Sequence, residues 1–78
     1  MRRFLIRYAI KTQTGQQLSS EINDANYLQE AEVNFIATMK DRSFEDKDYT
    51  VYEVIDVTDI ENERISELIK LIDKLRKL

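Results

Sequence analysis

The sequence predicts an α+β domain of order ββαβα, with a three-stranded, mostly antiparallel sheet and helices packed on one face. Three patterns predict it: an alternating N-terminal segment, two segments with apolar residues at helical spacing, and a β-branched and aromatic segment between them. With 78 residues, the chain has room for one small core. We therefore expect residues 1–78 to form a single domain, with a hairpin at 2–23, a helix at about 25–40, a strand at about 49–58 and a C-terminal helix at about 60–77.

The first strand of the hairpin follows from strict alternation. The residues on its apolar side are Phe4, Ile6, Tyr8 and Ile10. The segment Lys11–Gln16 then predicts a tight turn. A three-residue loop of Gln13, Thr14 and Gly15 would place the only glycine in the left-handed conformation that such a loop needs.

This loop sets the register of the hairpin. With Thr12 opposite Gln16, the apolar pairs are Ile10 with Leu18 and Ile6 with Ile22, and the charged pair is Arg7 with Glu21. A slip of one residue would break these pairs because it turns every side chain to the other face. We therefore expect Leu18 and Ile22 to join the core face on which the first helix packs.

The first helix begins after Asp24 or Asn26, either of which could cap it. Its apolar stripe consists of Leu28, Ala31, Phe35, Ile36 and Met39. A polar loop follows, and we expect its one aromatic residue, Phe44, to tuck back under the helix. The strand at 49–58 alternates imperfectly, which predicts either a bulge or partial cover on both faces.

The last helix follows Thr58-Asp59-Ile60-Glu61, a capping-box sequence. At 100° per residue its aliphatic side chains span an arc of about 180°, wider than the arc of about 100° that one-sided packing requires. The aliphatic residues that lie outside the part of the arc facing the sheet are Leu71, Leu75 and Leu78. We expect a homodimer in which these three leucines contact the second copy, because small domains gain much from association.

The hairpin and first helix resemble the opening of ubiquitin and its β-grasp relatives. Residues Lys11 to Gly15 match the Lys-Thr-x-Thr-Gly turn of that family, and Leu18 and Ile22 fall where its hairpin buries aliphatic side chains. The resemblance covers about the first 35 residues and implies a hairpin followed by a helix. The rest of the chain departs from the family and has no Gly-Gly tail, so the resemblance does not imply a conjugation role.

Composition excludes several classes of site. The chain has no histidine or cysteine, which rules out thiolate and histidine metal sites and every Ser-His or Cys-His catalytic arrangement. We expect a non-catalytic protein that needs no cofactor or metal. An alternating segment follows Met1-Arg2-Arg3, and no apolar run approaches the roughly 20 residues of a membrane span. We therefore expect a cytoplasmic protein without a membrane partner.

Acidic residues are concentrated in the middle of the chain, where residues 41–63 contain nine acids and two bases. This block predicts either a solvated face that balances the basic ends or a docking surface for a partner protein. Small, acidic, cysteine-free chains are common among phage and mobile-element accessory proteins, some of which present carboxylates where phosphates would sit. The expected partner-binding residues are Asp41, Glu45, Asp46, Asp48, Glu53 and Asp56. The loop lacks the central glycine and closing glutamate of a calcium loop, so we expect no ion there.

Basic residues near the N-terminus give the alternative function. On the first strand Arg3, Arg7 and Lys11 share one face, and Arg2 is adjacent. Such a stripe could track nucleic-acid phosphates if that face of the sheet were open. Two observations argue against nucleic-acid binding: the net charge is −3, and the same face has no aromatic residues. We therefore expect a protein partner before a nucleic acid.

Overall fold

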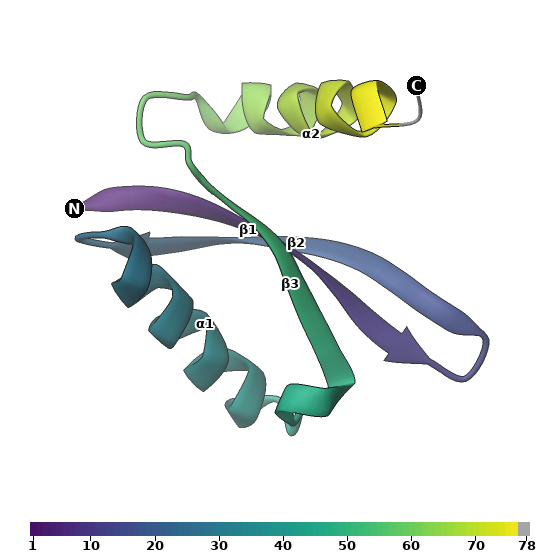
Figure 1. The fold of residues 1–78 in the computed structure, drawn as a ribbon. Helices are drawn as coiled ribbons and strands as arrows, with labels where there is room; N and C mark the ends of the chain where they lie inside the picture. The colour runs from purple at the N-terminus through teal and green to yellow at the C-terminus, as the bar shows by residue number, and fades with distance from the viewer. Residues whose placement is uncertain (77–78) are drawn as a thin grey trace.

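The computed structural model describes residues 1–76 and confirms the α+β fold with its ββαβα order (Figure 1). Both strand pairs are antiparallel, and the sheet order is β2-β1-β3. The elements are β1 (Arg2–Thr12), β2 (Gly15–Ala25), α1 (Leu28–Asp41), the short 3-10 helix η1 (Asp46–Asp48), β3 (Tyr49–Asp56) and α2 (Asn62–Arg76).

The register of the hairpin differs by one residue from the prediction. Thr12 pairs with Gly15 across a two-residue loop, and Gly15 has a φ of 143°, which side-chain-bearing residues rarely adopt. Leu18 therefore pairs with Ala9 and Ile22 with Leu5, on the face opposite the one expected. Leu18 and Ile22 are exposed on that face because the α2 core includes residues of β1 and β3 but none of β2, so their spacing did not indicate a buried face.

The two helices lie on opposite faces of the sheet, so the expectation of helices on one face is corrected (Figure 1). Even-numbered residues of β1, such as Ile6 and Tyr8, form a core with Phe35 and Met39 of α1. On the other face, Leu5 forms a second core with Val57 and with Ile65 of α2. The run of buried residues from Phe4 to Ala9 reflects this double cover.

A bulge in β3 confirms one of the two explanations offered for its imperfect alternation. Arg7 pairs with Glu53, whereas the next β1 residue, Tyr8, pairs with Val51. Tyr52 is thus the extra residue on β3. Because of this shift, Val51 and Val54 both lie on the α1 face although three positions separate them.

Helix α1 ends in a Schellman arrangement that returns the chain to the sheet. The N–H of Ser43 donates to the carbonyl of Lys40 at 2.9 Å, and the N–H of Phe44 donates to that of Met39 at 2.9 Å. Ser43 takes the left-handed conformation, with φ of 69°. Phe44 packs against the α1 core, as expected. The helix starts later than predicted because β2 continues to Ala25, which pairs with Arg2.

Hydrogen bonds hold the segment between β3 and α2 against β1. The N–H of Arg3 donates to Oγ1 of Thr58 at 3.0 Å, and the N–H of Val57 donates to the carbonyl of Arg3 at 2.8 Å. The guanidinium of Arg3 also donates to Asn62 and to the carbonyl of Ile60. The hydroxyl of Thr58 thus accepts a hydrogen bond from Arg3 of β1 and donates one to Asp56 of β3. Helix α2 begins at Asn62, two residues later than expected.

A candidate binding groove and an exposed helix flank

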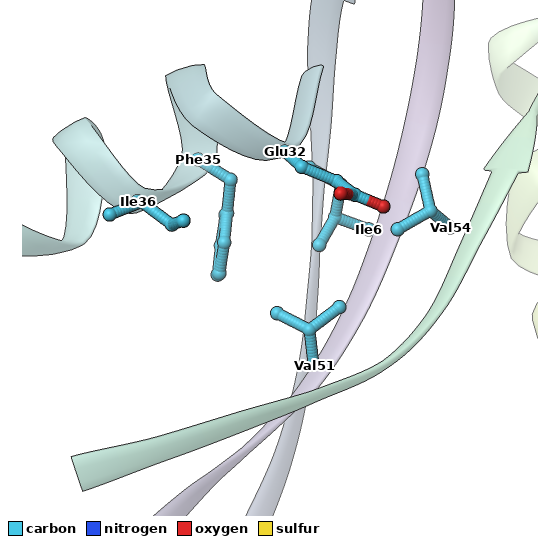
Figure 2. Close-up of a pocket in the computed structure, with 6 residues that line it drawn as sticks. All are labelled: Ile6, Glu32, Phe35, Ile36, Val51 and Val54. Carbon is cyan, nitrogen blue, oxygen red and sulfur yellow. The ribbon is translucent and has the colours of Figure 1, made fainter. Parts of the chain in front are cut away.

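A pocket of about 270 Å³ opens between α1 and β3 (Figure 2). Buried Ile6 and Phe35 form its inner part, and exposed Ile36 and Val51 lie at its rim. The lining residues are Ile6, Glu32, Phe35, Ile36, Val51 and Val54. The pocket is therefore an open apolar groove over the β3 side of the sheet.

The groove exists because α1 covers only part of its face. Ala31 packs with Phe4 and with Ala25 at the end of β2, and Met39 packs with Tyr8. Figure 1 shows α1 and β3 diverging from the turn at η1, so that the floor beside Val51 and Val54 is left open.

Among the described residues, Glu32 is the one charged residue that lines the groove. Its side chain is exposed, and Figure 2 shows the carboxylate reaching over the pocket beside Ile6 and Val54. A carboxylate above an apolar floor attracts a cation, and the low-dielectric floor screens that attraction less than bulk water does. The groove thus combines apolar surface with one negative charge.

On the opposite face, Arg7 is enclosed between the sheet and α2. Its side chain is 3% exposed; Nη2 donates to Oδ1 of Asp73 at 2.5 Å and Nη1 to Oε2 of Glu53 at 3.3 Å. The guanidinium carbon lies 5.4 Å from the ring centre of Tyr52. Burial lowers the pKa of Arg7, but the hydrogen bond to Asp73 and the nearby charges outweigh it, so the pKa stays above its usual value. Arg7 is therefore a buried cation that holds α2 to the sheet.

The four basic residues considered for nucleic-acid binding do not form one open stripe. Arg7 is covered by α2, and Arg3 holds the segment that leads into α2. Arg2 is exposed and pairs with Asp56, while Lys11 is exposed at the far end of β1. Glu21, the expected partner of Arg7, instead pairs with Arg42 on the α1 face.

The expected acidic surface is also divided. Asp41, Glu45 and Asp46 are exposed near the turn that joins α1 to β3, and Asp48 accepts a hydrogen bond from the N–H of Glu45 at 2.8 Å. Glu53 lies beside Arg7 on the other face.

Asp56 is held at the end of β3. The hydroxyl of Thr58, the guanidinium of Arg2 and the N–H of Thr58 all donate to its carboxylate, and together they lower its pKa from 3.8 to about 2. Glu53 and Asp56 thus make contacts within the fold, and the other four acids lie together near η1.

The flank of α2 carries two leucines that the core does not cover. Leu71 is 55% exposed and Leu75 is 61% exposed, whereas Ile65 is buried and Leu68 and Ile69 pack against the same core. The exposed fractions of Leu71 and Leu75 agree with the prediction from the sequence that the apolar arc of this helix is too wide for one-sided packing. Leu78, the third residue of the expected contact, lies outside the described residues.

The groove was not predicted from the sequence. The sequence did indicate the α1 side of the groove, because Ile36 widens the apolar stripe of this helix. Its β3 side was hidden because only the bulge brings Val51 and Val54 to one face. The signal that could have found it was the imperfect alternation of β3, read as a bulge.

Comparisons with family models, with curated proteins and with solved structures find no match to this chain. Within residues 1–76, acidic side chains form no cluster suited to holding a metal ion. None of the helices in that range is long and apolar enough to cross a membrane.

Proposed function

We propose that this chain is a small, non-catalytic protein-interaction module, and that the groove between α1 and β3 binds an extended segment of a partner protein. The observation that carries the proposal is the open apolar groove with Glu32 at its rim. A few polar groups over a mainly apolar concavity are typical of binding sites. A cytoplasmic location is part of the same proposal.

The charge of the groove defines the chemistry of the partner segment. An aliphatic side chain would contact Phe35, Val51 and Val54, and a neighbouring lysine or arginine would lie beside Glu32. The net charge of −3 favours approach of such a basic segment. The exposed acids near η1, Asp41, Glu45 and Asp46, would extend the contact at the end where α1 and β3 meet.

Self-association is the second part of the proposal. Leu71 and Leu75 are exposed on α2, on the opposite side of the sheet from the groove. A homodimer formed there leaves both grooves accessible. The analogy with phage accessory proteins rests on composition alone, and the nucleic-acid alternative lacks the open basic face that it requires because α2 covers Arg7.

A titration with defined peptides tests the groove. The probes are three capped hexapeptides with a central leucine flanked by lysine, alanine or glutamate, added to 15N-labelled protein. We expect the lysine-flanked peptide to shift the amide signals of Ile6, Ile36 and Val51. We expect it to bind about tenfold more tightly than the glutamate-flanked one, a difference of about 1.4 kcal/mol.

Two variants make the titration specific. Glu32→Lys should reverse the order of the lysine- and glutamate-flanked peptides, and Glu63→Lys, the same charge change on exposed α2, should not. Ile36→Lys should abolish binding while the circular dichroism spectrum stays unchanged. An absence of shifts at millimolar peptide, or an order unaffected by Glu32→Lys, would overturn the proposal.

A further inference from the structure

We propose that the second copy of the chain adds to the outer edge of β3, so that two sheets join in the order β2-β1-β3-β3-β1-β2 and the two α2 helices pack antiparallel. The inference rests on the proposed self-association and goes beyond it by naming the strand, the helix flank and the direction of pairing. Three independent features of the described residues carry it.

The first feature is the backbone of β3, which lies at the edge of the sheet. The N–H of Val57 donates to the carbonyl of Arg3, and two residues further along β1, Leu5 pairs with Ile55. Backbone groups of a strand point alternately to its two sides. The N–H groups of Val54 and Asp56 therefore point to the outer edge, where an added strand would bind.

The second feature is the direction of the exposed leucines. Asn62 and Asp73 reach Arg3 and Arg7 of β1, so one flank of α2 faces β1. At 3.6 residues per turn, Leu71 and Leu75 lie roughly 180° around the helix from that flank. They therefore point past β3 and over its outer edge.

The third feature is spacing. Helix α2 lies over β1 and β3, because Leu5 and Ile55 both contact its core. If the two β3 strands pair, the α2 axes lie two strand spacings apart, or about 9.6 Å. Packed helices lie about 8–10 Å apart. Strand pairing therefore also brings the leucine flanks of the two α2 helices to about the distance at which helices pack.

One two-fold axis fits both contacts. Ile65 packs near Leu5, and Asp73 reaches Arg7, so the middle of α2 lies near the level of Ile6 and its β3 partner Val54. An axis through this level, perpendicular to the sheet, makes both the strands and the helices antiparallel. Around it, Leu68 of one copy meets Leu71 of the other.

Charge favours the same direction. Beside the row formed by Leu68, Leu71 and Leu75, Glu67 and Lys74 lie on one line along α2, on opposite sides of the axis and about 4 Å and 7 Å from it. Antiparallel packing places Glu67 of each copy within about 3 Å, along the helix axis, of the level of Lys74 of the other copy. Their long side chains can span this offset and make two complementary pairs. Parallel packing would align like residues instead.

The assembly also changes the groove. Each groove is floored by Val51 and Val54 next to the proposed junction, on the face opposite α2. Joining the β3 edges places the two floors side by side between two α1 helices. The partner segment proposed above would then lie in one continuous trough shared by both copies.

Cysteine cross-linking tests the arrangement, since the chain has no cysteine of its own. In the antiparallel pair, residue 64 lies beside residue 75 of the other copy, whereas the two residues 75 are about 16 Å apart. Disulfides require Cα atoms within about 7 Å. We therefore expect an equimolar mixture of Arg64→Cys and Leu75→Cys proteins to form the mixed disulfide and neither protein alone to form a disulfide with itself. Lys70→Cys, on the outer side of α2, should remain uncross-linked.

Sedimentation equilibrium of the wild type and of charge variants completes the test. We expect a dimer at micromolar concentration, at least tenfold weaker dimerisation in Glu67→Lys, and recovery when Lys74→Glu is added. The same exchange at Glu63 and Lys70 should change little. A monomer would overturn self-association and this inference together while leaving the groove titration intact. A dimer in which Leu75→Cys links to itself, or in which the double exchange fails to recover, would overturn the inference alone.

Discussion

Arg7 of β1 and Asp73 of α2 are 66 positions apart in the sequence and share a 2.5 Å hydrogen bond between Nη2 and Oδ1. This contact fixes the rotation of α2 on the sheet. With Asp73 turned toward β1, Leu71 and Leu75 must lie on the other flank. The ion pair between buried Arg7 and partly exposed Asp73 thus acts with the core contacts of Ile65 to set which apolar surface of α2 is exposed.

The first prediction concerns this pair. Asp73→Asn should lower the free energy of unfolding by about 1–2 kcal/mol, because it leaves buried Arg7 with one anionic partner fewer while the 40% exposure of Asp73 limits the loss. Urea denaturation measures the change. Glu63→Gln, on the same helix but away from both Arg7 and the proposed dimer contact, should change it by less than about 0.5 kcal/mol. Equal effects of the two variants would contradict the assigned role of Asp73.

The second prediction tests the hairpin register. Leu18 is exposed and Leu5 is buried on the same face of the sheet. We expect Leu18→Ala to cost less than about 0.5 kcal/mol and Leu5→Ala about 2–5 kcal/mol in thermal or urea unfolding. A loss of more than about 2 kcal/mol in Leu18→Ala would favour the register with Thr12 opposite Gln16.

Local patterns were enough to predict the strands, the helices and their order. Alternation identified β1, and helical spacing identified α1 and α2, because each signal lies within one segment. The predicted register was wrong because a two-residue and a three-residue loop both accommodate Gly15, and because Leu18 and Ile22 are exposed, so their spacing did not indicate a buried face. The predicted pairing of Arg7 with Glu21 failed for the same reason.

The site was harder to predict because it depends on tertiary contacts. The exposed leucines of α2 were foreseen, since an apolar arc of 180° cannot be buried by one sheet. The groove needs Val51 and Val54 on one face, which follows from a bulge whose position the sequence leaves open. The contacts of Glu53 and Asp56 within the fold arise from long-range pairing with Arg7 and Arg2.

The third prediction concerns acid. The folded state holds the pKa of Asp56 at about 2, below its ordinary value of 3.8, through Thr58 and Arg2. The carboxylate therefore stabilises the fold above pH 3.8, and this stabilisation is lost as pH falls toward 2. In urea denaturation across this range, the wild type should lose its advantage over Asp56→Asn. Asp41→Asn controls for removal of one exposed carboxylate. A constant difference between the wild type and Asp56→Asn from pH 5 to pH 2 would contradict the assignment.

Amide hydrogen exchange at Val54 tests the central claim, a binding groove completed by pairing of β3 edges, most directly. The N–H of Val54 points outward, whereas that of its neighbour Ile55 points to β1. In the dimer we predict that Val54 exchanges at least about tenfold more slowly than in the Glu67→Lys protein at low concentration, and that Ile55 stays protected in both. Equal exchange of Val54 in dimer and monomer would contradict the account.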